Sequence, residues 1–198
     1  RVPLEHAAAR GNLGLVDTLL EAGADGSAGW RGCRGRTLLD AAAVGGSVGV
    51  VTALLRAGAE PDMNVVSMSP KRSALYAATV CGHEDVARRL VLAGADVRFV
   101  DPVTQCTVLH EAAYDGYEQI AGAGPNWLGA KGNGAPLHHA ALNGHAGIVS
   151  SLLLRGADKD TLELTRGTTP LMCAANEGGH IPVLKAILGH GADVNSRD

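Results

Sequence analysis

The sequence predicts an all-α protein in which one helical hairpin recurs six times along 198 residues. The first observation is a segment of the form Leu-x-x-Ala that returns every 28 to 36 residues, with its leucine at positions 4, 39, 75, 109, 137 and 171. The second is a Gly-Ala pair followed by Asp or Glu, which begins at Gly23, Gly58, Gly94, Gly156 and Gly191. Self-similarity at this period is typical of solenoids, in which each repeat buries apolar side chains against the next.

The second helix of each hairpin is predicted by apolar residues that precede the Gly-Ala pair. They lie eight, seven, four and three residues before the glycine, which is the spacing of one face of an α-helix. The stripe comprises Leu15, Val16, Leu19 and Leu20 in the first repeat, Val50, Val51, Leu54 and Leu55 in the second, and Ile148, Val149, Leu152 and Leu153 in the fifth. The glycine is then expected to end the helix in the left-handed conformation.

The first helix of each hairpin is expected to begin at the Thr-Pro or its equivalent. Proline suits the first helical turn because its missing N–H has no partner there in any case. The paired alanines allow two helices to approach closely. A further glycine is predicted to separate the two helices, at Gly11, Gly46, Gly82, Gly116 and Gly144.

The repeated unit resembles the ankyrin repeat, which is about 33 residues long and has a Thr-Pro-Leu-His-x-Ala signature. The match is close at residues 135–160, where the chain reads Ala-Pro-Leu-His-His-Ala-Ala and later Gly-Ala-Asp. The resemblance implies an all-α ankyrin-repeat solenoid of helix-turn-helix units, with β-hairpin-like fingers between them. It also implies one domain over residues 1–198, expected to be part of a longer protein, with repeats at 1–28, 29–64, 65–100, 101–129, 130–160 and 161–198.

The fourth repeat is shorter than the others by about six residues, and its Gly122-Ala123 follows Ala121 directly. The missing piece corresponds to the second half of the second helix. Two interpretations stay open: a truncated helix with a local kink, or residues absent from the sequence. A Cα–Cα separation well above 3.8 Å near residues 121–124 would indicate the second.

Composition excludes several classes of protein. The chain has 17 basic and 20 acidic residues and a net charge of −3, so a strongly basic surface for nucleic acid is not expected. No apolar run approaches the roughly 18 residues of a membrane-spanning helix, so no membrane insertion is expected. The four cysteines, at positions 33, 81, 106 and 173, form no Cys-x-x-Cys pair. Free thiols indicate a reducing, intracellular location, cytoplasmic or nuclear.

The histidines are better explained as scaffold than as metal ligands. The resemblance gives His110 and His138 the signature position, where the imidazole links neighbouring repeats. His83, His145 and His180 recur after the glycine between the helices, and recurrence at one position of a repeat favours a structural role. The chain also lacks a P-loop, a nucleophile elbow and a partnered catalytic cysteine. We therefore expect no metal, no cofactor and no catalytic residue, and interpret the protein as a non-enzyme.

The remaining candidate site is a surface. In the ankyrin family, fingertips and exposed first-helix positions bind partners. Carried over by register, this surface comprises Arg34, Arg36, Val44, Lys71, Arg72, Tyr114, Asp115, Asn133, Leu142, Asn143, Arg166, Asn176 and Glu177. Tyr114 beside Leu142 would be a binding hot spot or would merely cover the seam between repeats. The basic residues on the second and third fingers would steer an acidic partner or would simply be solvated.

These patterns favour a non-catalytic scaffold that binds another protein on the concave face formed by its fingers and first helices. The scaffold is expected to be monomeric. The alternative is a recruiting or regulatory arm of a larger enzyme, channel or ubiquitin ligase. A third hypothesis is modification of the repeats, because Asp193-Val194-Asn195 resembles the site on which asparaginyl hydroxylases act.

Overall fold

The computed structural model describes residues 3–26, 32, 35–59, 63–67, 71–117, 126, 134–176 and 178–196. They form helical hairpins grouped in two compact units, Arg1–Phe99 and Val100–Asp198.

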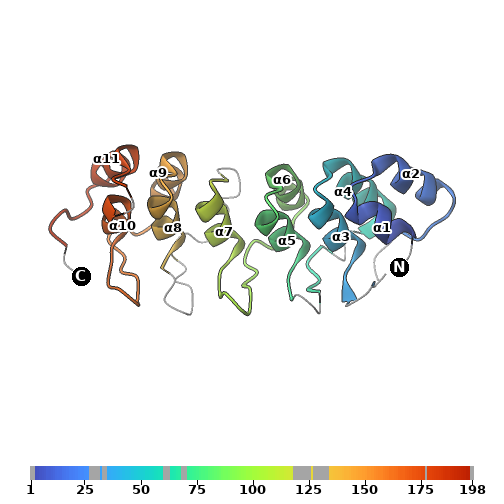
Figure 1. Cartoon of the computed structure of the whole chain (residues 1–198), viewed down its shortest axis with the longest axis horizontal. Helices are drawn as coiled ribbons and strands as arrows, with labels where there is room; N and C mark the ends of the chain where they lie inside the picture. Colours follow the sequence, from blue (N-terminus) through green and yellow to red (C-terminus); the bar gives the residue numbers. More distant parts are fainter. Residues whose placement is uncertain are drawn as a thin grey trace. The chain divides into compact units, whose positions relative to one another are not determined.

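The described residues of the first unit form three hairpins (Figure 1). Its helices are α1 (Pro3–Ala9), α2 (Leu13–Glu21), α3 (Leu38–Gly45), α4 (Val48–Leu54) with its continuation η2 (Leu55–Ala59), α5 (Ala74–Val80) and α6 (Glu84–Leu92). The first helices α1, α3 and α5 pack in one row and the second helices α2, α4 and α6 in another. This is the stacked arrangement that the repeat predicted.

The described part of the second unit comprises one first helix and two hairpins. Its helices are α7 (Val108–Asp115), α8 (Pro136–Leu142), α9 (Ala146–Leu154), α10 (Pro170–Asn176) and α11 (Ile181–Gly189). Helix α8 packs between α7 and α10, and α9 packs against α11. The question of the shortened fourth repeat concerns residues 118–125, which lie outside the described residues.

Local chemistry explains where the helices begin and end. Thr37, Ser47 and Ser73 each precede a helix, and their hydroxyl oxygens accept hydrogen bonds from the backbone N–H three residues later. The glycines of the Gly-Ala pairs, predicted to be left-handed, have positive φ, including Gly58 at 93°. The glycines predicted to separate the two helices also have positive φ, including Gly46 at 72°. The sequence prediction of both turns is confirmed.

The apolar stripes form the core, with one informative exception. Val50, Val51, Leu54 and Leu55 of the second repeat are all buried, as predicted. In the first repeat Val16 is buried, but the side chain of Leu15 remains 42% exposed. Among the described helices α2 packs against α1 of its own hairpin and against α4 of the next, and these contacts leave the Leu15 part of its stripe exposed.

The connections between hairpins are closed by backbone hydrogen bonds. Gly32 N–H donates to Arg36 O (2.8 Å), Ser67 N–H to Arg72 O (3.0 Å) and Glu163 N–H to Thr168 O (3.0 Å). Among the described residues the fingers contain one isolated antiparallel bridge, Val100–Thr107, and no strand. The fingers are therefore hairpin-like turns, and the structure is all-helical as predicted.

Signature histidines connect consecutive repeats. The Nδ1 of His138 accepts the Ala135 N–H (3.0 Å), so its proton lies on Nε2, which donates to Thr168 O (3.1 Å) in the next finger. His110 does the same with the Thr107 N–H (3.1 Å) and Gly134 O (3.2 Å). The predicted linking role is confirmed.

A second set of histidines lies one turn away. His83, His145 and His180 donate through Nε2 to the carbonyl oxygens of Val44, Tyr114 and Leu142, respectively, at the end of the preceding repeat's first helix. Each ring occupies the space next to an inter-helix glycine: a Cβ on Gly46 would lie 2.6 Å from His83. The scaffold interpretation of these residues is confirmed.

The neutral imidazole of His138 makes the protein's stability depend on pH. Burial lowers the pKa of His138 below its ordinary value of 6.5, although the hydrogen bond to Thr168 opposes the shift. As the pH falls through the ordinary value of 6.5, the unfolded chain binds the proton more readily than the folded chain. The free energy of unfolding should therefore fall as pH falls. Urea denaturation at pH 7.5 and at pH 5.5 measures this change. Between the two pH values the free energy of unfolding should decrease less for His138→Asn than for the native chain. An equal decrease in both would contradict this linkage.

Candidate partner-binding surface

The described part of the predicted surface is built from two structural positions. One is the finger residue just before each first helix, and the other is the exposed side of the first helix. Arg36 and Arg72 occupy the first position, and Val44, Tyr114, Leu142 and Asn176 occupy the second. Three predicted residues, Arg34, Asn133 and Glu177, lie outside the described residues.

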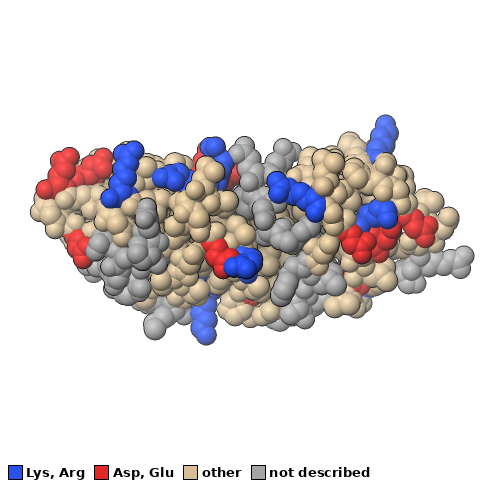
Figure 2. Space-filling model, turned by 180° about the vertical axis from the view of Figure 1, so that it is seen from behind, with Lys and Arg blue, Asp and Glu red and all other residues tan. Residues whose placement is uncertain are grey.

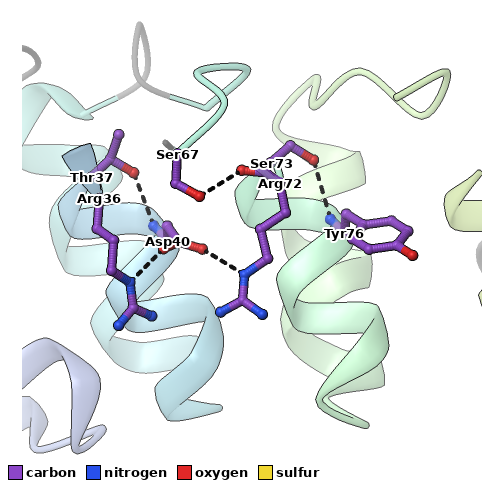
Figure 3. Close-up of polar contacts among 7 residues, drawn as sticks. All are labelled: Arg36, Thr37, Asp40, Ser67, Arg72, Ser73 and Tyr76. Atoms are coloured by element: carbon purple, nitrogen blue, oxygen red, sulfur yellow. Dashed lines mark hydrogen bonds and ion pairs between the residues drawn. The ribbon is translucent and has the colours of Figure 1, made fainter. Parts of the chain in front are cut away.

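Arg36 and Arg72 do not project freely from the fingers. The Nε of Arg36 donates to Asp40 Oδ2 (2.7 Å), and the Nε of Arg72 donates to Asp40 Oδ1 (3.4 Å). The side chain of Asp40 is 1% exposed, while those of the two arginines are 25% and 18% exposed. The three side chains form one cluster between α3 and α5 (Figure 3). Lys71, next to Arg72, is exposed.

Sequence reasoning missed Asp40. It occupies the signature position that His110 and His138 hold in later repeats, and Arg36 precedes it by four residues, the spacing of an intrahelical ion pair. That spacing was an available signal. The second arginine lies 32 residues further along, and only the packing of α5 against α3 brings it to the same carboxylate.

In the second unit, Tyr114 belongs to an aromatic group. Its side chain is 51% exposed, and its ring lies edge-on to His139 with centroids 6.3 Å apart. His139 in turn lies edge-on to His110 at 5.6 Å. Leu142 is partly buried against the core. His139 was not among the predicted site residues, although it lies in the second repeat of this unit on the first helix.

The predicted polar residues of the second unit differ in how far they are exposed and hydrogen-bonded. Asn143 donates through Nδ2 to His139 O (2.9 Å), so part of its amide is used within its own helix. Asp115 is exposed, and partial burial of its carboxylate raises the pKa of Asp115 while His145 pulls in the opposite direction. Arg166 and Asn176 are exposed.

The finger that carries Arg166 is held by a carboxylate. Burial raises the pKa of Glu163, but hydrogen bonds donated by the hydroxyl groups of Thr165 and Thr168 outweigh it, so the pKa of Glu163 lies below its ordinary value. A charged Glu163 therefore accepts bonds from both sides of its own turn. This fixes the finger's conformation in the absence of a partner.

The buried Cys173 thiol lacks the character of a nucleophile. The described cysteines Cys81, Cys106 and Cys173 are free. Burial raises the pKa of Cys173, which lowers its thiolate fraction at neutral pH. In the described part of the chain, no three His, Cys, Asp or Glu side chains gather as a metal-binding group.

The surface charge is mixed. Figure 2 shows Lys and Arg side chains of described residues interspersed with Asp and Glu side chains on the face in view. Among the described residues, no helix has both the length and the apolar character needed to cross a membrane.

Helical hairpins, left-handed glycines and inter-repeat histidines together define a solenoid repeat protein. The ankyrin repeat family matches at residues 34–66 and 71–102, and a model of three ankyrin repeats matches residues 109–198. The protein belongs to the ankyrin repeat family.

Several relatives share part of this chain. It is 32% identical over 134 residues to the ankyrin repeat and KH domain-containing protein mask-1 of Caenorhabditis elegans, covering 63% of this chain and 5% of that protein. It is 31% identical over 146 residues to the putative ankyrin repeat protein FPV031 of Fowlpox virus (strain NVSL), covering 68% and 42%. It is 29% identical over 118 residues to palmitoyltransferase ZDHHC13 of Homo sapiens, covering 58% and 18%. The chain thus spans less than half the length of these curated relatives.

Solved structures show the same fold. The human ASB11 ankyrin repeat domain matches with a TM-score of 0.79 and 25% identity, covering all of this chain and 87% of that one. A chain from the structure of the predatory endopeptidase Bd0816 of Bdellovibrio bacteriovorus in complex with the immunity protein Bd3460 matches with a TM-score of 0.76 and 24% identity, covering 96% and 98%. The second likeness concerns the fold alone.

Proposed function

We propose that this protein is a non-catalytic scaffold that binds another protein through its finger and first-helix surface. Ankyrin repeats generally mediate protein–protein interaction. The observation that carries the proposal is the exposure of apolar side chains at one position of the first helices. Val80 is 47% exposed on α5 and Tyr114 is 51% exposed on α7, whereas the other apolar positions of these two helices are buried. Apolar and aromatic side chains held on rigid helices are the usual anchors of protein interfaces.

The test compares two variants of the chain in affinity capture from a lysate of cells that encode it. The surface variant carries Lys71→Glu, Val80→Ala, Tyr114→Ala and Arg166→Glu, all at exposed positions of the proposed face. The control carries Arg88→Glu, Leu92→Ala, Leu154→Ala and Lys185→Glu, which are exposed on second helices. Circular dichroism should show that both variants keep the native helix content.

A bound protein should be recovered at least about tenfold less with the surface variant, since truncating interface anchors costs more than about 1 kcal/mol each. The control should recover it at the native level. Equal recovery by both variants would remove the proposed face as the binding site.

The second candidate function is a recruiting or regulatory arm of a larger protein. It is favoured by the match to 18% of a palmitoyltransferase, in which the similar segment is a minor part of an enzyme. Sequencing the complete transcript tests it. A catalytic or channel domain encoded on the same polypeptide would support this function, and a transcript encoding ankyrin repeats alone would exclude it.

A further inference from the structure

Two arginines from consecutive repeats share one buried carboxylate in the first unit. Both occupy the residue whose carbonyl closes a finger: Arg36 O accepts from Gly32 N–H (2.8 Å), and Arg72 O accepts from Ser67 N–H (3.0 Å) and from the Ser67 hydroxyl (3.2 Å). Asp40 is itself fixed at the start of α3, because its N–H donates to the Thr37 hydroxyl (3.0 Å). The backbone and the side chains of the cluster are therefore positioned before any partner arrives.

Each arginine uses only part of its guanidinium group. The bonds to Asp40 come from Nε, at 2.7 Å for Arg36 and 3.4 Å for Arg72. Among the described residues, no acceptor is found for the terminal nitrogens of either side chain. Figure 3 shows the two guanidinium groups on either side of Asp40, with their terminal nitrogens directed away from the fingers and along the first helices. Two sets of hydrogen-bond donors thus lie on the same side of the cluster.

The charges of the cluster do not cancel. Two guanidinium groups and one carboxylate leave one positive charge. Because Asp40 is buried and each of its oxygens already accepts one arginine, the residual charge resides on the partly exposed guanidinium groups. A planar guanidinium fork matches the two oxygens of a carboxylate, and charge-assisted bonds of this kind are stronger than neutral ones. The cluster is suited to a group with a single negative charge.

Apolar side chains continue the surface along the same helices. Val44 lies one helical turn beyond Asp40 on α3 and is partly exposed, and Val80 is 47% exposed on α5. Figure 3 shows the terminal nitrogens of both arginines directed along these two helices, away from the fingers. A segment that placed an acidic side chain on the arginines would bring its neighbouring side chain to these valines.

We propose that Arg36 and Arg72 form a docking site for the carboxylate of an Asp or Glu in a partner protein, with an adjacent apolar side chain resting on Val44 and Val80. The inference rests on the proposed function and specifies the chemistry of the partner at one part of that face. Asp40 acts as the positioning residue, because it holds both arginines in place and does not itself touch the ligand.

The test uses the whole 198-residue chain and short peptides as probes. The acidic probe is acetyl-Ala-Glu-Leu-Ala-amide, and the matched neutral probe has Gln in place of Glu. Nuclear magnetic resonance of the arginine Nε–Hε groups reports binding directly. The Glu peptide should cause saturable shifts at Arg36 and Arg72, with a dissociation constant at least about fivefold lower than that of the Gln peptide.

Variants distinguish the contribution of the planar guanidinium group from that of its positive charge. Arg72→Lys keeps a positive charge beside Asp40 but removes the fork, and it should weaken binding of the Glu peptide at least about fivefold. Arg88→Lys changes an exposed arginine on α6, where it pairs with Asp85 at 3.1 Å, and it should leave binding unchanged. The pair Asp40→Asn with Arg72→Gln keeps the residual charge and leaves no unpaired carboxylate, so a folded but weakened variant is expected.

Three results would overturn the proposal. One is equal shifts with the Glu and Gln peptides, and another is native affinity in the paired variant. The third is saturable binding of a phosphoserine peptide without binding of the Glu peptide, which would replace the carboxylate by a phosphorylated partner. For this comparison the capture is repeated with a surface variant that carries only Lys71→Glu, Tyr114→Ala and Arg166→Glu, which leaves Arg36, Arg72 and both valines intact, so failure of the docking site and failure of the proposed function are distinguishable.

Discussion

Replacing Leu137 by Ala should lower the free energy of unfolding by about 2–5 kcal/mol. Leu137 is fully buried on α8, within a core that includes Ala140, Val149 and Leu152. Truncation removes apolar contacts and leaves a cavity between helices that are fixed by their own backbone hydrogen bonds. Because each repeat of a solenoid contacts only its neighbours, the loss is not spread over a larger core. Urea denaturation followed by circular dichroism measures the change.

The matched control is Leu154→Ala. Leu154 is 80% exposed at the end of α9, so the same chemical change removes little buried surface. Its effect should stay within about 0.5 kcal/mol. A comparable loss of stability in both variants would show that α8 does not supply the core described above.

Replacing Gly45 by Ala should also destabilise the protein, by about 1–3 kcal/mol, although helix propensity alone predicts a gain of up to about 1 kcal/mol. Gly45 is the last residue of α3, where a Cβ would lie 2.5 Å from Ala8 O and 2.9 Å from Ala9 O of α1. Both obstacles are backbone atoms and cannot move aside as a side chain would. The two first helices must separate, which disturbs the close packing between them.

Gly189→Ala provides the comparison. Gly189 is the last residue of α11, and a Cβ there would meet nothing within 4 Å. The same substitution at the same place in a helix should therefore be neutral or stabilising. The midpoint of thermal unfolding should fall for Gly45→Ala and should stay unchanged or rise for Gly189→Ala, and a stabilised Gly45→Ala variant would contradict the close approach of α1 and α3.

The repeat architecture could be predicted because its signals are local. A glycine with positive φ at Gly46 or Gly58 follows from the needs of a single turn, and the stripe Val50, Val51, Leu54 and Leu55 follows from the period of a single helix. The inter-repeat bonds of His110 and His138 were predicted from the family resemblance. The structure confirms them, with Nε2–O distances of 3.2 Å and 3.1 Å. The two distances are similar because each repeat places the next finger in the same way relative to its signature residue.

The positions of the candidate surface residues could be predicted from the sequence, but the contacts that their side chains make could not. Register identified Arg36 and Arg72, yet their shared ion pair with Asp40 depends on how α5 packs against α3. Register also identified Tyr114, whose aromatic neighbour is His139. The Arg72–Asp40 and Tyr114–His139 contacts join residues from different repeats, and no spacing along one repeat specifies that these side chains will meet.

The sequence by itself determined the helical hairpins, their boundaries and the left-handed glycines, because each depends on interactions within a few residues of the chain. Only the tertiary structure decided that a buried carboxylate holds two arginines in place and that Val80 and Tyr114 remain exposed. The physical reason is that the burial of a side chain and its ion pairs depend on how closely neighbouring repeats approach. Those distances are set by the stacking of the repeats.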